Sequence, residues 1–246
     1  MRSRRGQLVA AVAELARRYR LPVGSDDALL ALIDLLAGDE HAPSAVTDPR
    51  AAVDVHLADS LVALDVDDVR RAGRIADIGA GAGFPGLPLA IALPHARVVL
   101  VESNTRRAAF LERAVALTGA RGAEVVNARV EQWAEGRGSC DLVLARALAP
   151  LPVVVEYAAP LLRVGGSLVA WRGRPDREVE RAGERAARET GLEGSEVRRV
   201  HPYPGAEHRY LHLMSKVSET PARFPRRTGV ALKRPLGAPG GTDGSA

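Results

Sequence analysis

The chain has 246 residues, 46% of them apolar, which is enough to fill the core of one α/β domain of ordinary size. No uncharged apolar run approaches the roughly 18 residues of a membrane span, and the apolar N-terminal segment lacks a cleavage pattern, so we expect a cytoplasmic protein without a membrane partner. The single cysteine, Cys140, excludes an internal disulfide and a zinc site built from several thiolates of this chain. We expect Cys140 to fill core volume.

The net charge of +4 belongs to the C-terminal end. Residues 221 to 246 contain five basic side chains against one acid, Asp243, whereas residues 1 to 220 sum to zero. Such a block suits a polyanion such as nucleic acid, and the alternative is a solvated end that keeps the protein in solution. The prolines of this basic tail, residues 219–246, are expected to limit its collapse onto the rest of the chain.

The first 66 residues predict a helical N-terminal extension. Apolar residues recur at helical spacing over residues 7–20, and a second helix is predicted over 25–38, with Ser25 as its cap and Gly38 at its end. The helical pattern continues over residues 47–64, where Asp48 and Pro49 mark the start of a helix. We expect this extension to pack on the main domain.

From residue 67 to 218 the pattern is that of an α/β domain. Apolar runs at 74–79, 97–103, 123–128, 140–147 and 165–173 alternate with helix-like segments at 86–93, 104–118, 130–135 and 150–162. This alternation predicts a parallel sheet with helices on both faces. Two further strands, at 195–203 and 208–216, follow a charged helix at 176–190 and are expected to close a seven-stranded, mostly parallel sheet as an antiparallel pair. The last ten residues, "GAPGGTDGSA", are expected to be disordered.

A glycine-rich turn, "DIGAGAGFPG", follows the first predicted strand. In an open parallel sheet the ligand lies at the carboxyl ends of the strands, and the first strand commonly leads into that site. Gly79, Gly81 and Gly83 are spaced G-x-G-x-G, and Phe84 stands where a dinucleotide fingerprint has its third glycine. The spacing therefore disfavours a nucleotide-binding oxidoreductase.

Two carboxylates indicate which ligand the turn would take. Asp77 stands two residues before the first glycine, where it would oppose a pyrophosphate and favour a cation. Glu102 ends the second predicted strand, where a carboxylate can accept from both ribose hydroxyls. S-adenosylmethionine meets both conditions because its ammonium and sulfonium are positive and it has no phosphate. The alternative is an ordinary tight turn with a solvent-facing glutamate.

Several motifs together resemble one family. "DIGAGAGFPGLPLAI", "VESNTRRAAFLERA", "NARVEQW", "LARALAPL" and "HLADS" look like the bacterial 16S ribosomal RNA guanine-N7 methyltransferases RsmG, also called glucose-inhibited division protein B. The match runs in order from about residue 47 to residue 216, and the Pro/Arg-rich end is similar to that of many members. The resemblance implies a class I, Rossmann-like S-adenosylmethionine-dependent methyltransferase acting on guanosine 527 of 16S RNA or of the 30S subunit. We expect it to work as a monomer without a metal.

The resemblance also implies roles for individual residues. Gly79 and Phe84 would contact the cofactor, Val130 and Glu131 would lie against its adenine, and Arg146 would reach the cofactor edge of the active site. His56, Asp59 and Ser60 match the family's H-x-x-D-S and would lie beside the cofactor mouth, in contact with substrate or in a capping or core-polar role. The residues that would meet RNA phosphate are all arginines: Arg129, Arg172, Arg223, Arg226 and Arg227. For Arg129 the alternative is a surface salt bridge. For the tail the resemblance leaves a second role open, a lid that folds back beside the active site with Phe224 or Arg226 covering the cofactor.

The chemistry of guanine N7 fits the residues that the motifs contain. N7 carries a lone pair and no proton, so attack on a sulfonium methyl needs in-line placement at about 3 Å and no general base. Arg146 is therefore the candidate active-site residue without a role as acid or base. The alternatives are a class I methyltransferase acting on another RNA, a protein or a small molecule, and an RNA-binding module without catalysis.

Overall fold

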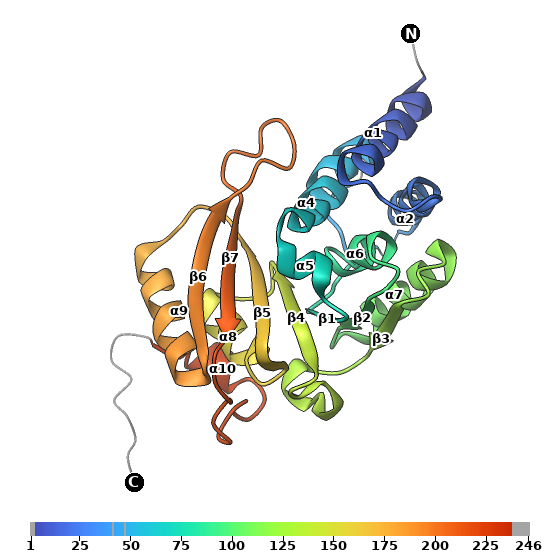
Figure 1. Cartoon of the computed structure of the whole chain (residues 1–246). Helices are drawn as coiled ribbons and strands as arrows, with labels where there is room; N and C mark the ends of the chain where they lie inside the picture. Colours follow the sequence, from blue (N-terminus) through green and yellow to red (C-terminus); the bar gives the residue numbers. More distant parts are fainter. Residues whose placement is uncertain (1–2, 41, 47, 238–246) are drawn as a thin grey trace.

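The sheet has seven strands in the order β3-β2-β1-β4-β5-β7-β6, in a computed structural model that describes residues 3–40, 42–46 and 48–237 (Figure 1). Only β7 runs against its neighbours, pairing antiparallel with β5 and with β6. The seven-stranded, mostly parallel sheet predicted from the sequence is confirmed. The strands are β1 (Arg74–Ile78), β2 (Arg97–Val101), β3 (Ala123–Val126), β4 (Cys140–Arg146), β5 (Leu162–Arg172), β6 (Leu192–Arg199) and β7 (Tyr210–Lys216).

Two hydrophobic cores lie on opposite faces of the sheet, because neighbouring residues of a strand point to opposite sides. Ile75 of β1 belongs to the core shared with the N-terminal helices, α6 (Gly86–Ala92) and α7 (Thr105–Thr118). Ala76 and Ile78 belong to the other core, which α8 (Leu151–Ala158) and α9 (Arg177–Thr190) cover. Cys140 is fully buried in this second core, as expected.

The N-terminal helices begin and end where local signals place them, with one exception. Asp48 accepts from the backbone N–H of Ala51 and Pro49 opens α3, as predicted. Ser25 is not the cap of α2: Gly24 holds that position, and Ser25 is the first helical residue and is buried. The elements here are α1 (Arg4–Tyr19), α2 (Ser25–Gly38), α3 (Pro49–Ala52), the π-helical turn η1 (Val53–Ala58), α4 (Asp59–Leu61), η2 (Val62–Asp65) and α5 (Asp67–Arg71).

Two predicted helices of the main domain are shorter or of another kind. Residues 130–135 form two short 3₁₀ segments, η3 (Val130–Gln132) and η4 (Ala134–Gly136), in place of an α-helix. The helix predicted at 150–162 ends at Ala158, and Leu162 already pairs with Cys140 as the first residue of β5. Apolar residues continue through both elements, so periodicity could not separate them.

The basic tail corrects an expectation, because its described part is folded against the second core. Phe224 is 5% exposed, and α10 (Val230–Lys233) packs on α8 and buries Ala231. Arg226 binds Glu156 of α8 with a bidentate fork, Nε to Oε1 at 2.8 Å and one terminal nitrogen to Oε2. The prolines therefore did not prevent collapse. Residues 238–246, where we expect disorder, and residue 47 of the predicted 47–64 helix lie outside the described residues.

Candidate functional site

The glycine turn joins β1 to α6 with three glycines in the left-handed region. Gly79, Gly81 and Gly83 have φ of +71°, +58° and +91°. A side chain at Gly79 would also be blocked, because its Cβ would lie 2.5 Å from a methyl of Leu148. A Cβ on Gly81 would meet only the carbonyl oxygen of Gly79, at 3.8 Å, so conformation alone demands glycine there. The turn keeps its backbone bare at the carboxyl end of β1.

The two predicted carboxylates both hold this turn. Glu102 accepts from the N–H of Gly81 at 3.0 Å and from that of Asn104 at 2.8 Å. Asp77 is 1% exposed and accepts from the N–H of Gly86, the first residue of α6, at 2.8 Å. Burial raises the pKa of Asp77 to about 7, although the Gly86 N–H opposes the shift. The structure thus gives Asp77 a position behind the turn, where it fixes the start of α6.

Arg146, the last residue of β4, lies at the centre of a cluster that includes the N-terminal extension. Its guanidinium donates to the carbonyl of Val55 at 3.1 Å and to Asp59 at 2.8 Å, and a terminal nitrogen lies 3.3 Å from Nδ1 of His56. Its charged carbon also lies 5.7 Å from the centre of the Phe84 ring. The π-helical turn η1 supplies Val55 and His56, and such turns are frequent at functional sites.

Two members of the predicted H-x-x-D-S group take part in this cluster, and the third does not. The His56 ring stacks on Phe84 with centroids 4.5 Å apart, and burial together with Arg146 lowers its pKa to about 4. His56 is therefore neutral at physiological pH. Ser60 is fully buried and donates to the carbonyl of His56 at 2.6 Å, which gives it the core-polar role that the sequence left open.

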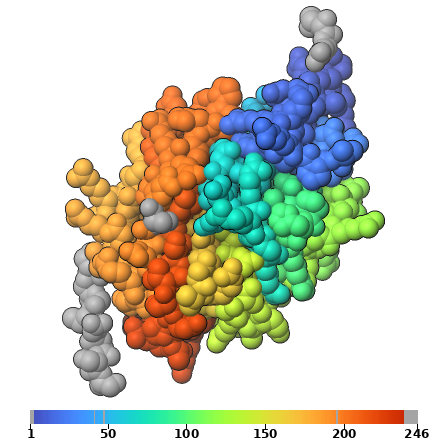
Figure 2. Space-filling model, viewed as in Figure 1, coloured from blue at the N-terminus to red at the C-terminus, as the bar shows by residue number. Residues whose placement is uncertain are grey.

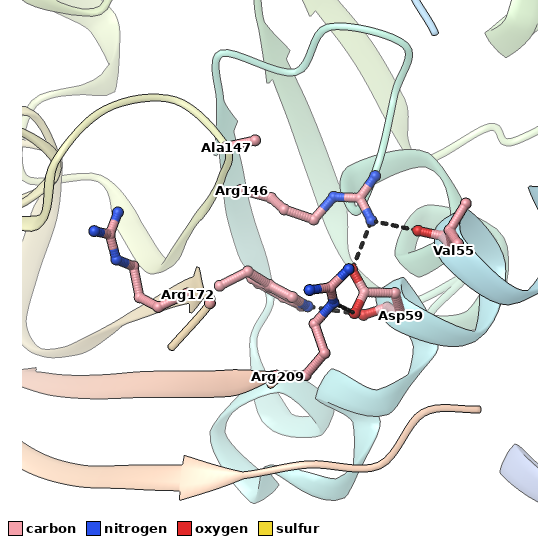
Figure 3. A pocket seen from close by; sticks show the side chains of 8 residues that line it. Val55, Asp59, Arg146, Ala147, Arg172 and Arg209 are labelled. Atoms are coloured by element: carbon pink, nitrogen blue, oxygen red, sulfur yellow. Dashed lines mark hydrogen bonds and ion pairs between the residues drawn. The ribbon is translucent and has the colours of Figure 1, made fainter. Parts of the chain in front are cut away.

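A pocket of about 460 Å³ opens beside Arg146, at the carboxyl ends of β4 and β5 (Figure 3). Arg146 and Arg209 approach the carboxylate of Asp59 from different elements, whereas Arg172 points away from it and donates to the carbonyl of Ala149 at 2.9 Å. The pocket is lined by Val55, Asp59, Arg146, Ala147, Trp171, Arg172, Gly173 and Arg209.

Sequence reasoning missed Arg209 and Trp171. The Nε of Arg209 lies 3.3 Å from Asp59 Oδ1, and the indole N–H of Trp171 donates to the Asp59 carbonyl at 2.7 Å. Both residues therefore help to hold Asp59 in place at the wall of the pocket. Trp171 could have been noticed because it stands near the end of an apolar strand. Arg209 gave no such signal, because arginine is so frequent in this chain that one of them carries little information.

The predicted adenine and RNA residues are spread over the molecule. Val130 is half-buried on the second core, and the Glu131 carboxylate accepts from the N–H of Gly229 in the tail at 3.0 Å. Arg129 is exposed just before η3. Arg172 alone among the five predicted RNA contacts lines the pocket. Of the tail arginines, Arg226 is paired with Glu156 under the second core, whereas Arg227 is exposed and the exposed Arg223 lies 3.8 Å from Glu189.

Within the described ranges no helix is long and apolar enough to cross a membrane. In the same residues no group of three or more His, Cys, Asp or Glu side chains could hold a metal ion. The chemistry that this site offers comes from arginines, carboxylates, aromatic rings and bare backbone.

Comparison with known proteins gives one consistent result. Residues 29–204 match the family GidB, rRNA small subunit methyltransferase G. The ribosomal RNA small subunit methyltransferase G of Rubrobacter xylanophilus is 47% identical over 82% of this chain and 80% of its own length. The protein of the same name from Deinococcus radiodurans is 38% identical over 93% of this chain and 94% of its own length.

Solved structures agree on the fold. A predicted O-methyltransferase from Agrobacterium tumefaciens has a TM-score of 0.50 and 30% identity, covering 67% of this chain and 81% of its own. A mutant of the 16S rRNA (adenine(1408)-N(1))-methyltransferase from Catenulisporales acidiphilia has a TM-score of 0.51 at 19% identity, covering 63% and 89%. With its class I methyltransferase fold and its matched motifs, this chain belongs to the GidB family of rRNA small subunit methyltransferases G.

Proposed function

We propose that this chain transfers the methyl group of S-adenosylmethionine to N7 of a guanine in 16S ribosomal RNA, which by family resemblance is guanosine 527. The observation that carries the proposal is the segment 146–148, which joins the pocket to the glycine turn. Arg146 and Ala147 line the pocket, and Leu148 lies against Gly79. A guanine in the pocket and a cofactor at the glycine turn would therefore lie side by side, as methyl transfer requires.

The residues present fit the cofactor. The three glycines with positive φ leave the turn without side chains, and Glu102 offers carboxylate oxygens at the carboxyl end of β2. Gly79, Gly81, Gly83, Phe84 and Glu102 would hold it, with Val130 and Glu131 beside the adenine. Asp77 would act from behind the turn through Gly86. When bound, the cofactor supplies an electrophilic methyl on a sulfonium.

The pocket would hold the guanine next to this turn. Because N7 has no proton to lose, the protein needs to orient the base and exclude water, and no side chain has to accept a proton. Guanine presents two acceptors on its major-groove edge, O6 and N7. An arginine that donates to O6 alone leaves the N7 lone pair free to attack, and Arg146 is the candidate because it ends β4 beside Phe84.

Asp59 reduces the positive charge of the pocket beside Arg146, which we call the acceptor pocket. Methylation leaves guanine with a positive charge, and three arginines around it would oppose that product. The buried Asp59 carboxylate neutralises part of the charge of Arg146 and Arg209 and holds both in place. The Arg172 guanidinium donates to a backbone carbonyl. Its positive charge therefore remains available to bind a phosphate of the RNA.

A direct assay tests the proposal. Purified protein is incubated with methyl-labelled S-adenosylmethionine and with either 30S subunits or deproteinised 16S RNA, and the modified nucleoside is identified and mapped. We expect label in 7-methylguanosine at one guanosine, and Gly81→Val, which forces a β-branched residue to φ +58°, should abolish it. Label in another nucleoside, in protein or in a small molecule would replace the proposed substrate.

A further inference from the structure

A second cavity, of about 380 Å³, lies at the loop between β6 and β7, outside the acceptor pocket. In Figure 1 this loop rises beyond the ends of the two strands, and in Figure 2 it lies next to the N-terminal helices. Arg18 of α1 connects this helix to the loop by donating to the carbonyl of Pro202 at 3.4 Å. The cavity is lined by Arg18, Arg199, His201, Pro202, Tyr203, Pro204, Gly205, Ala206 and Glu207.

The two arginines of this cavity are bound to carbonyls and a ring and are not neutralised by a described carboxylate. Arg199 donates to the backbone carbonyl of Glu207 at 2.9 Å, and Arg18 has the Pro202 carbonyl and the Tyr19 ring as partners. Neither guanidinium is in an ion pair with a carboxylate of the described chain. The Glu207 carboxylate also lines the cavity, so the local balance is two arginines against one acid, with His201 exposed beside them.

Arg209 joins this cavity to the acceptor pocket. One terminal nitrogen of Arg209 lies 3.4 Å from the hydroxyl of Tyr203, which lines the second cavity, and its Nε lies 3.3 Å from Asp59 in the first. The Tyr203 ring is half-buried against the first core, so one side of it is fixed by packing. The two cavities are therefore neighbours with one shared wall.

From this arrangement we propose that the second cavity is an RNA subsite, which binds the backbone and one base of a nucleotide next to the methylated guanine. Arg18 and Arg199 contact phosphates, and Tyr203 offers a ring on which an unpaired base can stack. The site favours single-stranded RNA, because only there are bases free to leave their stack. The inference rests on the proposed function, since it requires that RNA occupy the acceptor pocket.

The tail is the rival for this role, and its position argues against it. Tyr203 packs on the first core with Val200, whereas Ala231 of the tail packs on the second, so the two segments lie on opposite faces of the sheet. Arg226 is also neutralised by Glu156. The RNA is therefore held by the β6–β7 loop and α1, on the side from which the N-terminal helices reach Arg146.

The test compares charge removal at two places. Arg18→Ala/Arg199→Ala removes two exposed charges of the cavity, and Arg137→Ala/Arg188→Ala removes two exposed charges near the amino ends of β4 and β6, at the opposite edge of the sheet. RNA affinity is measured against salt concentration with a single-stranded fragment. With a slope of roughly −0.7 per phosphate contact, the first variant should flatten the dependence by about 1.4 and the second should leave it unchanged.

Further arms separate the outcomes. Tyr203→Leu should weaken RNA binding at least threefold with an unchanged salt slope, because it removes a stacking surface and no charge. Equal slopes for wild type and the Arg18/Arg199 variant, or a larger loss in Arg223→Ala/Arg227→Ala, would overturn the subsite. Adenosylhomocysteine affinity by calorimetry reports that each variant is folded. If the wild type binds RNA through these residues yet methylates no guanine N7, the proposed function fails, and what stands is RNA binding by this cavity without the neighbouring guanine.

Discussion

Asp59 carries a buried carboxylate whose two oxygens lie against different arginines, Arg146 at 2.8 Å and Arg209 at 3.3 Å. Its side chain is 5% exposed and that of Arg146 is 16% exposed. A charge so placed is costly without its partner, because little water can replace it. The pair therefore couples the stability of the N-terminal extension to the geometry of the pocket.

Arg146→Ala is expected to affect both folding and activity. Among the described residues it leaves Asp59 with the more distant Arg209 as its cationic partner, so the free energy of unfolding should fall by about 3 kcal/mol, as for one partner removed from a buried pair. Methyl transfer should fall at least a hundredfold, since the base loses its orienting donor. Urea unfolding and methyl transfer to RNA are the measurements.

A double-mutant cycle provides the control. Asp59→Asn combined with Arg146→Ala should cost less than the sum of the single changes, by about 1 kcal/mol or more, because the stranded charge is gone. Additive costs would show that the ion pair does not stabilise the fold. Wild-type methyl transfer in Arg146→Ala would remove this residue from the site.

Asp77 predicts a pH dependence of stability whose sign can be derived. Its folded pKa, raised by burial to about 7, exceeds its unfolded value of 3.8, so the folded state holds the proton more tightly. The contribution of Asp77 is therefore complete below about pH 4 and is lost as pH rises to about 7. Asp77→Asn removes this loss and can still accept from Gly86 through its amide oxygen.

The difference in unfolding free energy between Asp77→Asn and wild type should thus move in favour of the variant from pH 4 to pH 7 and stay constant above. His56 and His212, whose pKa values burial lowers to about 4, contribute the opposite slope between about pH 4 and 6.5 in both proteins and cancel in the difference. Denaturant unfolding at pH 4.5, 6 and 8 measures it. A constant difference would mean that Asp77 is ionised throughout.

At the scale of elements, the tail binds α8 as a strap and is not a free arm. Glu156 has a side chain that is 1% exposed, and its partner Arg226 lies seventy residues further along the chain. Gly229 of the same segment donates to Glu131, next to the expected adenine site. The tail and η3, where the adenine is expected, are thus connected through the backbone of Gly229.

Truncation after Ser218 is therefore expected to destabilise the whole protein. It exposes the surface under Phe224 and Ala231 and leaves the Glu156 carboxylate without its arginine. The melting temperature should fall by several degrees, since a loss of 1 kcal/mol already shifts it by roughly 2–4 °C in a chain of this size. Thermal unfolding and calorimetry with adenosylhomocysteine measure the effect.

Glu156→Gln in the truncated chain is the matched control. It removes the stranded charge and should recover part of the lost stability. If truncation left the melting temperature unchanged and flattened the salt dependence of RNA binding, the tail would be an RNA arm, as its composition first indicated.

The strands of the sheet could be predicted because their information is local. Each of the first five is an apolar run next to a turn, and the glycine turn carries its own conformational signal. The tail could not, because its partner is one glutamate within "LPVVVEYA", a helix that is otherwise almost wholly apolar. Arg209 could not either, because its role depends on Asp59, far away in the sequence. Long-range charge pairs leave no periodic signal in a single sequence.

At the scale of the molecule, the sheet separates the face proposed to bind RNA from the face on which the tail packs. The N-terminal helices, the β6–β7 loop and the acceptor pocket share the first core, whereas the tail and α8 share the second. The glycine turn lies between the two faces at the carboxyl end of β1, which pairs with β2 on one side and β4 on the other. Cofactor and RNA would therefore meet at one edge while each contacts different segments.

Hydrogen exchange can map this division in one experiment. Adenosylhomocysteine should slow exchange in residues 79–86, 102–104 and 129–131, because these segments form the proposed cofactor site and their amides become less free to open. A single-stranded RNA fragment, added second, should slow exchange in residues 199–211 and 171–174 and at the end of α1. Residues 221–236 should be unaffected by RNA, since they lie on the other face. Protection by RNA confined to the tail would contradict both the acceptor pocket and the subsite, whereas protection in the tail on adding adenosylhomocysteine alone would show that the Gly229–Glu131 contact transmits cofactor binding to the strap.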